Sequence, residues 1–148
     1  DNLFDDASFI ITPDKSVSQT KINLIEDFAY SIHFKKVGTA TPEEHDQIIA
    51  FTSQIAHVFS NAYIKSHTHQ KQLGFSAGSF QDLTRVAKLN ETMWTPLFLL
   101  NKDPLCFEID YIIARLTEYR DAMQNNDAER LKSLLRDGRI LKEETKTL

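Results

Sequence analysis

Arg85 is the side chain whose possible chemistry is easiest to specify. Its guanidinium is planar and permanently charged, so it can hold a carboxylate through two parallel hydrogen bonds. The chain reaches it through a turn that contains Gly78, and a start signal at Ser79–Asp82 predicts a short helix that carries the arginine. The plainer alternative is a surface arginine, or one paired with Asp82 at the i, i+3 spacing of a helix.

His57 is the second candidate, because of the residues that share its face of a predicted helix. At about 100° per residue, one side of that helix collects small and hydrogen-bonding residues rather than lysine and glutamate. This side comprises Asp46, Ala50, Ser53, His57 and Asn61, and the opposite side comprises Ile48, Thr52, Ile55, Phe59 and Ala62. The pattern alone slightly favours a solvated histidine on an outer face, and a face that lines a polar cleft is the alternative.

The composition is that of an ordinary globular protein of one domain, or of one domain with an appended piece. The 148 residues are 41% hydrophobic and 26% charged, with a net charge of −4 and dispersed Lys and Arg, so neither nucleic acid nor an anionic membrane is an expected partner. No apolar stretch reaches membrane-spanning length. Cys106 is the single cysteine, expected as a small core residue in a protein of the reducing cytosol.

The first 40 residues predict a strand, a helix and a second strand, over residues 9–12, 17–33 and 34–39. Such a βαβ unit has parallel strands. One unit alone cannot cover both faces of a parallel sheet, so we expect this segment to be a piece of a larger α/β protein. The absence of an initiator methionine agrees with that expectation.

Residues 41–148 predict helices throughout, which makes the fold class mainly α after the short βαβ piece. Thr41-Pro-Glu-Glu44 has the capping-box pattern for a helix running to about Ser66. Helical pattern resumes from Glu91 to about Asn125, with Pro96 and Pro104 as kinks or restarts. Asn126 or Asp127 should cap a last helix that ends near Gly138.

A heptad seam runs along the long helix, with spacings of four and three residues. Its members are Leu105, Ile109, Ile112, Leu116, Tyr119 and Met123. The pattern alone favours packing against another helix of the same subunit, and pairing with a second copy is the alternative.

Four motifs occur in a fixed order along the chain: Thr52-Ser-Gln-Ile-Ala-His57, Ala77-Gly-Ser-Phe-Gln-Asp-Leu-Thr-Arg85, Met93-Trp94 and Asn101-Lys102. In this the chain resembles the helical C-terminal domain of prephenate dehydrogenases. The family pattern is Ser-His-x-Pro-His, Gly-Gly-x-Phe-x-Asp-x-Thr-Arg, Met-Trp and Asn-Lys. Gln54, Ala56 and Ser79 depart from it. The resemblance implies residues 1–40 as the last piece of a nucleotide-binding domain and 41–148 as the dimerisation and substrate domain.

The resemblance also implies roles for individual residues. Arg85 and His57 match substrate-binding residues, Gly78 a glycine whose backbone approaches the ligand, and Trp94 a tryptophan near the active site that reaches across the dimer. Ser53 matches a serine implicated in the response to tyrosine. From the residues alone, Gly78 could serve only turn geometry and Trp94 only the core.

The implied whole enzyme oxidises and decarboxylates prephenate to 4-hydroxyphenylpyruvate with NAD or NADP in the cytoplasm. Its partners would be a second copy of the chain, the substrate and a tyrosine effector. The catalytic histidine and the cofactor site are expected outside this chain, which has no Gly-x-Gly-x-x-Gly and no metal-ligand pattern. Arogenate as substrate, or a noncatalytic dimerisation or amino-acid-sensing module, are the alternatives.

Overall fold

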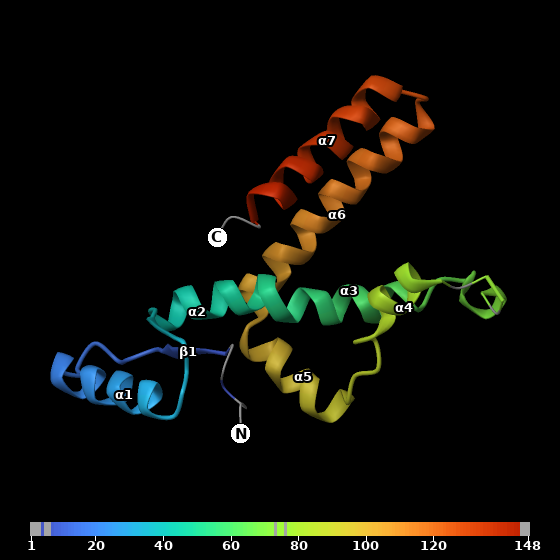
Figure 1. Cartoon of the computed structure of the whole chain (residues 1–148). Coiled ribbons are helices and arrows are strands. Elements are labelled where there is room, and N and C mark those ends of the chain that lie inside the picture. Colours follow the sequence, from blue (N-terminus) through green and yellow to red (C-terminus); the bar gives the residue numbers. More distant parts are fainter. Residues whose placement is uncertain (1–3, 5–6, 73, 76, 146–148) are drawn as a thin grey trace. The chain divides into compact units, whose positions relative to one another are not determined.

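The computed structural model describes Phe4 and residues 7–72, 74–75 and 77–145. The chain divides into two compact units, Asp1–Leu105 and Cys106–Leu148. Each unit is described by itself, and Figure 1 shows the elements that compose them.

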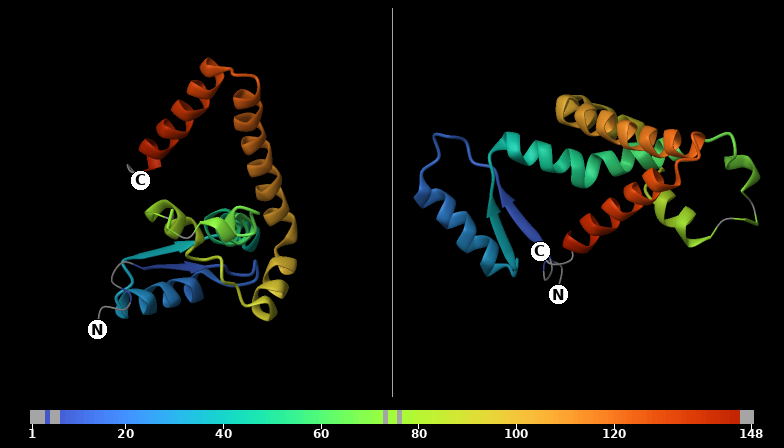
Figure 2. Two further views of the ribbon diagram at one scale, coloured as in Figure 1. Left: turned by 90° about the vertical axis from the view of Figure 1, so that its right-hand side faces the viewer. Right: turned by 90° about the horizontal axis from the view of Figure 1, so that it is seen from above.

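The first unit begins with the predicted strand–helix–strand unit. It consists of β1 (Ser8–Ile11), α1 (Gln19–Ser31) and β2 (Lys36–Thr39). The strands are parallel, with Ser8 opposite Lys36 and Ile11 opposite Thr39. Figure 2 shows them side by side in both views. The prediction is confirmed with boundaries moved by one or two residues, which is the usual uncertainty of helix and strand ends.

The turn from α1 to β2 uses histidine where glycine is commoner. His33 has a φ of 74°, its N–H bonds to Tyr30 O, and the next N–H, of Phe34, bonds to Ala29 O. These two bonds define a Schellman motif, which satisfies carbonyls at the helix end. Phe34 then stacks on Phe4 and meets Phe9 edge-on. The turn therefore directs an aromatic cluster against the start of β1.

Three helical segments follow without a loop: α2 (Pro42–Ile49), the π-helical η1 (Ala50–Gln54) and α3 (Ile55–Tyr63). The predicted capping box is confirmed, since Thr41 Oγ1 accepts from Glu44 N–H and Glu44 accepts from Thr41 N–H. That backbone bond lowers the pKa of the Glu44 carboxyl. The box therefore stabilises α2 at neutral pH and loses that contribution when acid protonates Glu44.

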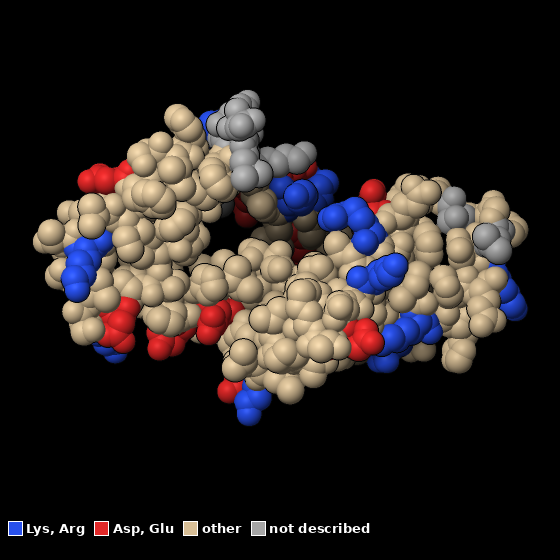
Figure 3. Space-filling view, turned by 90° about the horizontal axis from the view of Figure 1, so that it is seen from below, with Lys and Arg blue, Asp and Glu red and all other residues tan. Residues whose placement is uncertain are grey.

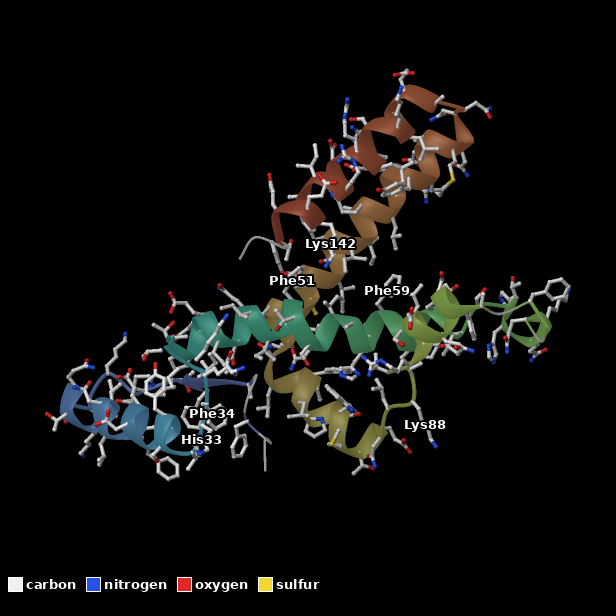
Figure 4. All side chains as sticks on the ribbon, viewed as in Figure 1. His33, Phe34, Phe51, Phe59, Lys88 and Lys142 are labelled. Atoms are coloured by element: carbon white, nitrogen blue, oxygen red, sulfur yellow. The ribbon has the colours of Figure 1, made fainter. Side chains whose placement is uncertain are left out.

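The π-helical turn has no counterpart in the predictions, which assume one regular helix. A π turn adds a residue, so side chains beyond it are rotated by roughly 100° relative to those before it. Ala50, on the side predicted to be small and polar, is buried, but so are Gln54, which was on neither side, and Ile55, which was on the apolar side. On the side predicted to be apolar, Ile48 is exposed, and so is the neighbouring Phe51. Figure 4 shows Phe51 and Phe59 on the side of this row away from α5.

The rest of the first unit contains η2 (His69–Lys71), α4 (Gly78–Thr84), α5 (Glu91–Leu100) and the start of α6 (Lys102–Gln124). Asn90 caps α5 through its side chain, which accepts from Met93 N–H. Pro96 lies inside α5 and Pro104 in the first turn of α6, so the predicted restart is confirmed. The break itself falls at Asn101.

The second unit is a pair of antiparallel helices, the body of α6 and α7 (Ala128–Glu144). Asn126 takes a φ of 53° in the turn, and the Asp127 side chain caps α7 by accepting from Arg130 N–H, as predicted. Tyr119 Oη donates to Leu134 O, and Arg130 reaches Glu118. These contacts join α6 to α7.

Two predictions in this unit are wrong. Cys106 is exposed and is not a core residue. Gly138 does not end α7, which continues for six residues to Glu144. A glycine weakens a helix but does not terminate it unless the backbone turns left-handed there, and φ of Gly138 is ordinary.

The surface is not dominated by one sign of charge. In Figure 3 uncharged residues cover most of one face, and acidic and basic groups both appear on it. Within the described ranges, no helix has the length and apolar character needed to span a membrane. Over the same ranges, no three His, Cys, Asp or Glu side chains gather as a metal site would need.

We expect Gly138→Ala to raise the free energy of unfolding by about 0.5–1 kcal/mol, because Gly138 is a mid-helix glycine with open space around its Cα. Gly74→Ala is the matched control. Its surroundings are equally open, but its φ is +84°. The same added methyl group should therefore destabilise it by about 1 kcal/mol. Urea unfolding of both variants measures the difference, and equal signs would contradict the explanation.

Candidate functional site

His57 lies in α3, one turn after the π-helical segment, and its side chain contacts other segments of the chain as well as solvent. Its ring is half-buried, with its centroid 4.2 Å from that of Trp94. Its Nδ1 lies 3.4 Å from the carbonyl oxygen of Val86. The polar side of the helix thus meets two other segments of the chain, and the outer-face prediction does not describe this histidine.

Asn61, one turn beyond His57, makes the stronger contact with the same neighbouring segment. Its Nδ2 donates to Ala87 O at 2.9 Å. Between these two residues, Ser60 is only 1% exposed, and its hydroxyl has no hydrogen-bond partner among the described residues. The small side chain of Ser60 is consistent with close packing at this contact. His57 and Asn61 together hold the backbone of residues 86–87.

Arg85 directly precedes that held backbone. Helix α4 ends at Thr84, whose hydroxyl donates to Phe80 O, so Arg85 is the residue that closes the helix rather than one inside it. Helix α4 also begins at Gly78, with no side-chain cap, so the predicted start signal at Ser79 is wrong. Over the part of the chain that the structure describes, no carboxylate, Asp82 included, forms an ion pair with Arg85. The guanidinium is exposed, while its backbone is fixed by its neighbours.

Trp94 belongs to α5, and its ring contacts that of His57. The indole is half-buried and lies 5.2 Å from Phe98, one turn further along the same helix. The structure therefore brings Trp94 beside His57 of its own chain. Lys88 occupies the exposed segment between α4 and α5 (Figure 4).

Gly78 and Ser53 complete the set of predicted residues. Gly78 is exposed, has an ordinary φ, and a Cβ added to it would meet nothing within 4 Å. Turn geometry therefore does not require glycine there. Ser53 is half-buried in the π-helical segment, one turn before His57. Neither residue contacts His57 or Trp94 through a described hydrogen bond.

The sequence does not predict one buried pair of polar residues in the elements that carry this site. Asn101 Nδ2 donates to Gln54 Oε1 at 2.8 Å and to Asp46 O at 2.9 Å. Both side chains are buried, at 7% and 6% exposure. In the sequence, Asn101 belongs to the Asn-Lys motif and Gln54 departs from the Ser-His-x-Pro-His motif, and neither pattern predicts that the two residues meet. A polar side chain at a break between two apolar helices was the available signal.

Comparison with known proteins places this chain in a family. A model of the family described as "Prephenate dehydrogenase, dimerization domain" matches residues 41–137. A prephenate dehydrogenase of Bacillus subtilis is 28% identical over an alignment of 136 residues that covers 87% of this chain and 36% of that protein. A cyclohexadienyl dehydrogenase of Zymomonas mobilis is 31% identical over 135 residues, covering 87% of this chain and 46% of that protein.

Solved structures share the fold. Synechocystis arogenate dehydrogenase superposes with a TM-score of 0.84 at 20% identity, over 97% of this chain and 54% of that one. Prephenate dehydrogenase from Aquifex aeolicus, in complex with hydroxyphenyl propionate and NAD⁺, gives a TM-score of 0.74 at 23% identity, over 92% and 49%.

The chain thus carries the helical domain seen in dehydrogenases of prephenate and related cyclohexadienyl compounds. It belongs to the prephenate dehydrogenase family, whose dimerization domain it contains at residues 41–137. It spans less than half the length of the two relatives described above.

We expect Asn61→Ala to lower the free energy of unfolding by about 1 kcal/mol, because it removes a hydrogen bond to a half-buried carbonyl. Ser60→Ala is the control on the next residue. It removes a buried hydroxyl that bonds to nothing described, so stability should stay within about 0.5 kcal/mol or rise. Thermal or urea unfolding compares them, and an equal loss in both would show that the Asn61 bond contributes nothing.

Proposed function

We propose that this chain supplies the substrate-binding and dimerisation part of an NAD(P)-dependent prephenate dehydrogenase. The complete reaction would be oxidative decarboxylation of prephenate to 4-hydroxyphenylpyruvate in tyrosine biosynthesis. The observation that supports it most is the meeting of His57, Trp94 and the backbone beside Arg85 within one family domain. Residues 1–40 would close the nucleotide-binding domain, and residues 41–148 would form the helical one.

Arg85 is proposed to hold a substrate carboxylate. An exposed guanidinium on a fixed backbone, with no carboxylate of the described chain paired to it, is free to take a bidentate anion. His57 would bind the other end of the substrate, and Trp94 would provide an apolar wall beside it. The open space around Gly78 leaves room for a ligand to approach its backbone closely.

The cofactor would be NAD or NADP, held by parts of the protein other than those described. The turn from β1 to α1, residues 12–18, contains no glycine, so it does not offer the phosphate-binding loop of a dinucleotide site. The described residues therefore do not fit the cofactor. Cys106, the single and free cysteine, supports a cytoplasmic location.

A homodimer built through the helical domain is proposed from the apolar surface that a single chain leaves open. On the heptad seam, Leu116 is 52% and Met123 58% exposed. In the first unit, Phe51 is 64% exposed on the side of its helical row away from α5. Packing within the chain thus leaves these two seam residues uncovered, while Leu105 is buried and Ile109, Ile112 and Tyr119 are half-buried. A tyrosine effector acting near Ser53 is a further part of the proposal.

Arogenate is the second candidate substrate, since a structure of an arogenate dehydrogenase has the same fold. A noncatalytic dimerisation or sensing module is the candidate from another class. The test is NADH or NADPH production by the protein of the whole reading frame, with prephenate and arogenate supplied separately. Turnover of prephenate supports the proposal, turnover of arogenate alone supports the second candidate, and neither supports the module. The 148-residue chain should be inactive by itself.

Replacing Arg85 with alanine should lower kcat/KM for prephenate in the complete enzyme by roughly 30- to 700-fold, equivalent to about 2–4 kcal/mol. Arg85→Lys should recover only part, because a point charge does not reproduce the planar fork. Lys88→Ala, which removes an exposed cation three residues away, is the control and should stay near wild type. Melting temperatures should not move, since Arg85 is exposed. Unchanged kinetics for Arg85→Ala would remove the assignment.

Leu116→Glu should weaken the dimer at least tenfold, about 1.4 kcal/mol, because it places a charge in an apolar seam. Ala114→Glu is the control, since it adds the same charge to the same helix off the seam. Sedimentation or light scattering over a concentration series measures both. A monomeric wild type, or equal weakening by the two variants, would show that the seam is not the interface.

A further inference from the structure

We infer that Gln54 and Asn101 form a positioning pair that sets the relative placement of the His57 and Trp94 rings. The two amides meet in the interior of the first unit, between the row α2–η1–α3 and the end of α5. Neither touches the candidate site by a described contact. Their importance for a substrate rests on the proposed function, but the geometry does not.

The hydrogen bonding fixes how the pair is oriented. Asp46 O is a carbonyl and can only accept, so the atom of Asn101 that faces it must be the amide nitrogen. That nitrogen's second proton points to Gln54, which must present its oxygen. Asn101 Oδ1 is buried without a partner among the described residues. The side chain therefore makes its described hydrogen bonds through its nitrogen alone.

The pair spans the π-helical turn. Asp46 lies one turn before η1, and Gln54 is its last residue. Asn101 therefore bonds to the chain on both sides of the inserted residue. A π turn is less favourable than α-helix and persists where its surroundings hold it, often at functional sites. Without the clamp, reversion to regular helix would rotate His57 by roughly 100° about the helix axis.

The same pair anchors the tryptophan. Asn101 closes α5, with its N–H bonded to Leu97 O, and Trp94 lies two turns earlier on that helix. Gln54 lies three residues before His57. One buried amide–amide bond thus ties together the helices that carry the two rings. The Asn61 bond to Ala87 holds α3 to the segment before α5, but not to the end of α5.

Trp94 is the only tryptophan of the chain, so its fluorescence reports on the ring pair directly. A protonated imidazole in contact with an indole quenches its emission. Emission should therefore fall when acid adds a proton to the imidazole. Arg85, Lys88 and Glu91 are ionisable residues close to Trp94 in the sequence and could also affect its emission. The response is therefore assigned to His57 only if His57→Asn abolishes it.

The test compares Gln54→Met and Asn101→Ala with wild type. The first keeps the side-chain length without the acceptor, and the second removes the donor. Both should lose most of the pH-dependent quench while far-ultraviolet circular dichroism stays helical. Ser60→Ala, an equally buried polar deletion on α3 with no hydrogen bond to lose, should keep the wild-type response.

Four results would overturn the inference: a wild-type quench in both amide variants, a response that survives His57→Asn, equal loss in Ser60→Ala, or loss of helical signal in both amide variants. The last would mean that the pair holds the fold rather than orients the rings. No substrate or cofactor enters the measurement. A negative result here therefore leaves the dehydrogenase proposal standing, and absence of turnover leaves this inference standing.

Discussion

The hydrogen bond between Asn101 and Gln54 is the contact on which the arrangement of the first unit depends. It is buried, it joins the row α2–η1–α3 to the end of α5, and its donor also holds Asp46 O. Removing one partner would leave a buried amide without its bond, which costs more than the bond itself contributes. A helix with an inserted residue and a helix break meet at this point, and the two helices that adjoin it carry His57 and Trp94.

Local chemistry explains which elements were predictable. Thr41 and Glu44 satisfy each other's backbone donors, and the Asp127 side chain accepts one backbone N–H at the start of α7, so these helix starts follow from a few adjacent residues. The π turn has no such local signature, because it depends on Asn101, which lies 47 residues beyond Gln54. The predicted helix end at Gly138 is wrong for a related reason. Whether a glycine ends a helix depends on its φ, and the sequence does not show φ.

The candidate site was predictable in its members more than in its geometry. Helical spacing put His57 and Asn61 on one small-residue side, and the structure turns that side toward residues 86–87 and Trp94. Arg85 was expected inside a helix and instead closes it. Its position depends on bonds that its neighbours make to a distant helix. The spacing of residues within one segment does not predict contacts between residues that are far apart in the sequence.

The central claim is that the surface around His57, Trp94 and Arg85 binds a carboxylated substrate. The most direct measurement is a titration of Trp94 emission with prephenate at constant pH, in wild type and in Arg85→Ala. The account predicts a saturable change in the wild-type chain that the arginine variant loses while its own emission spectrum stays unchanged. No saturable change in wild type, or the same affinity in both proteins, would contradict it.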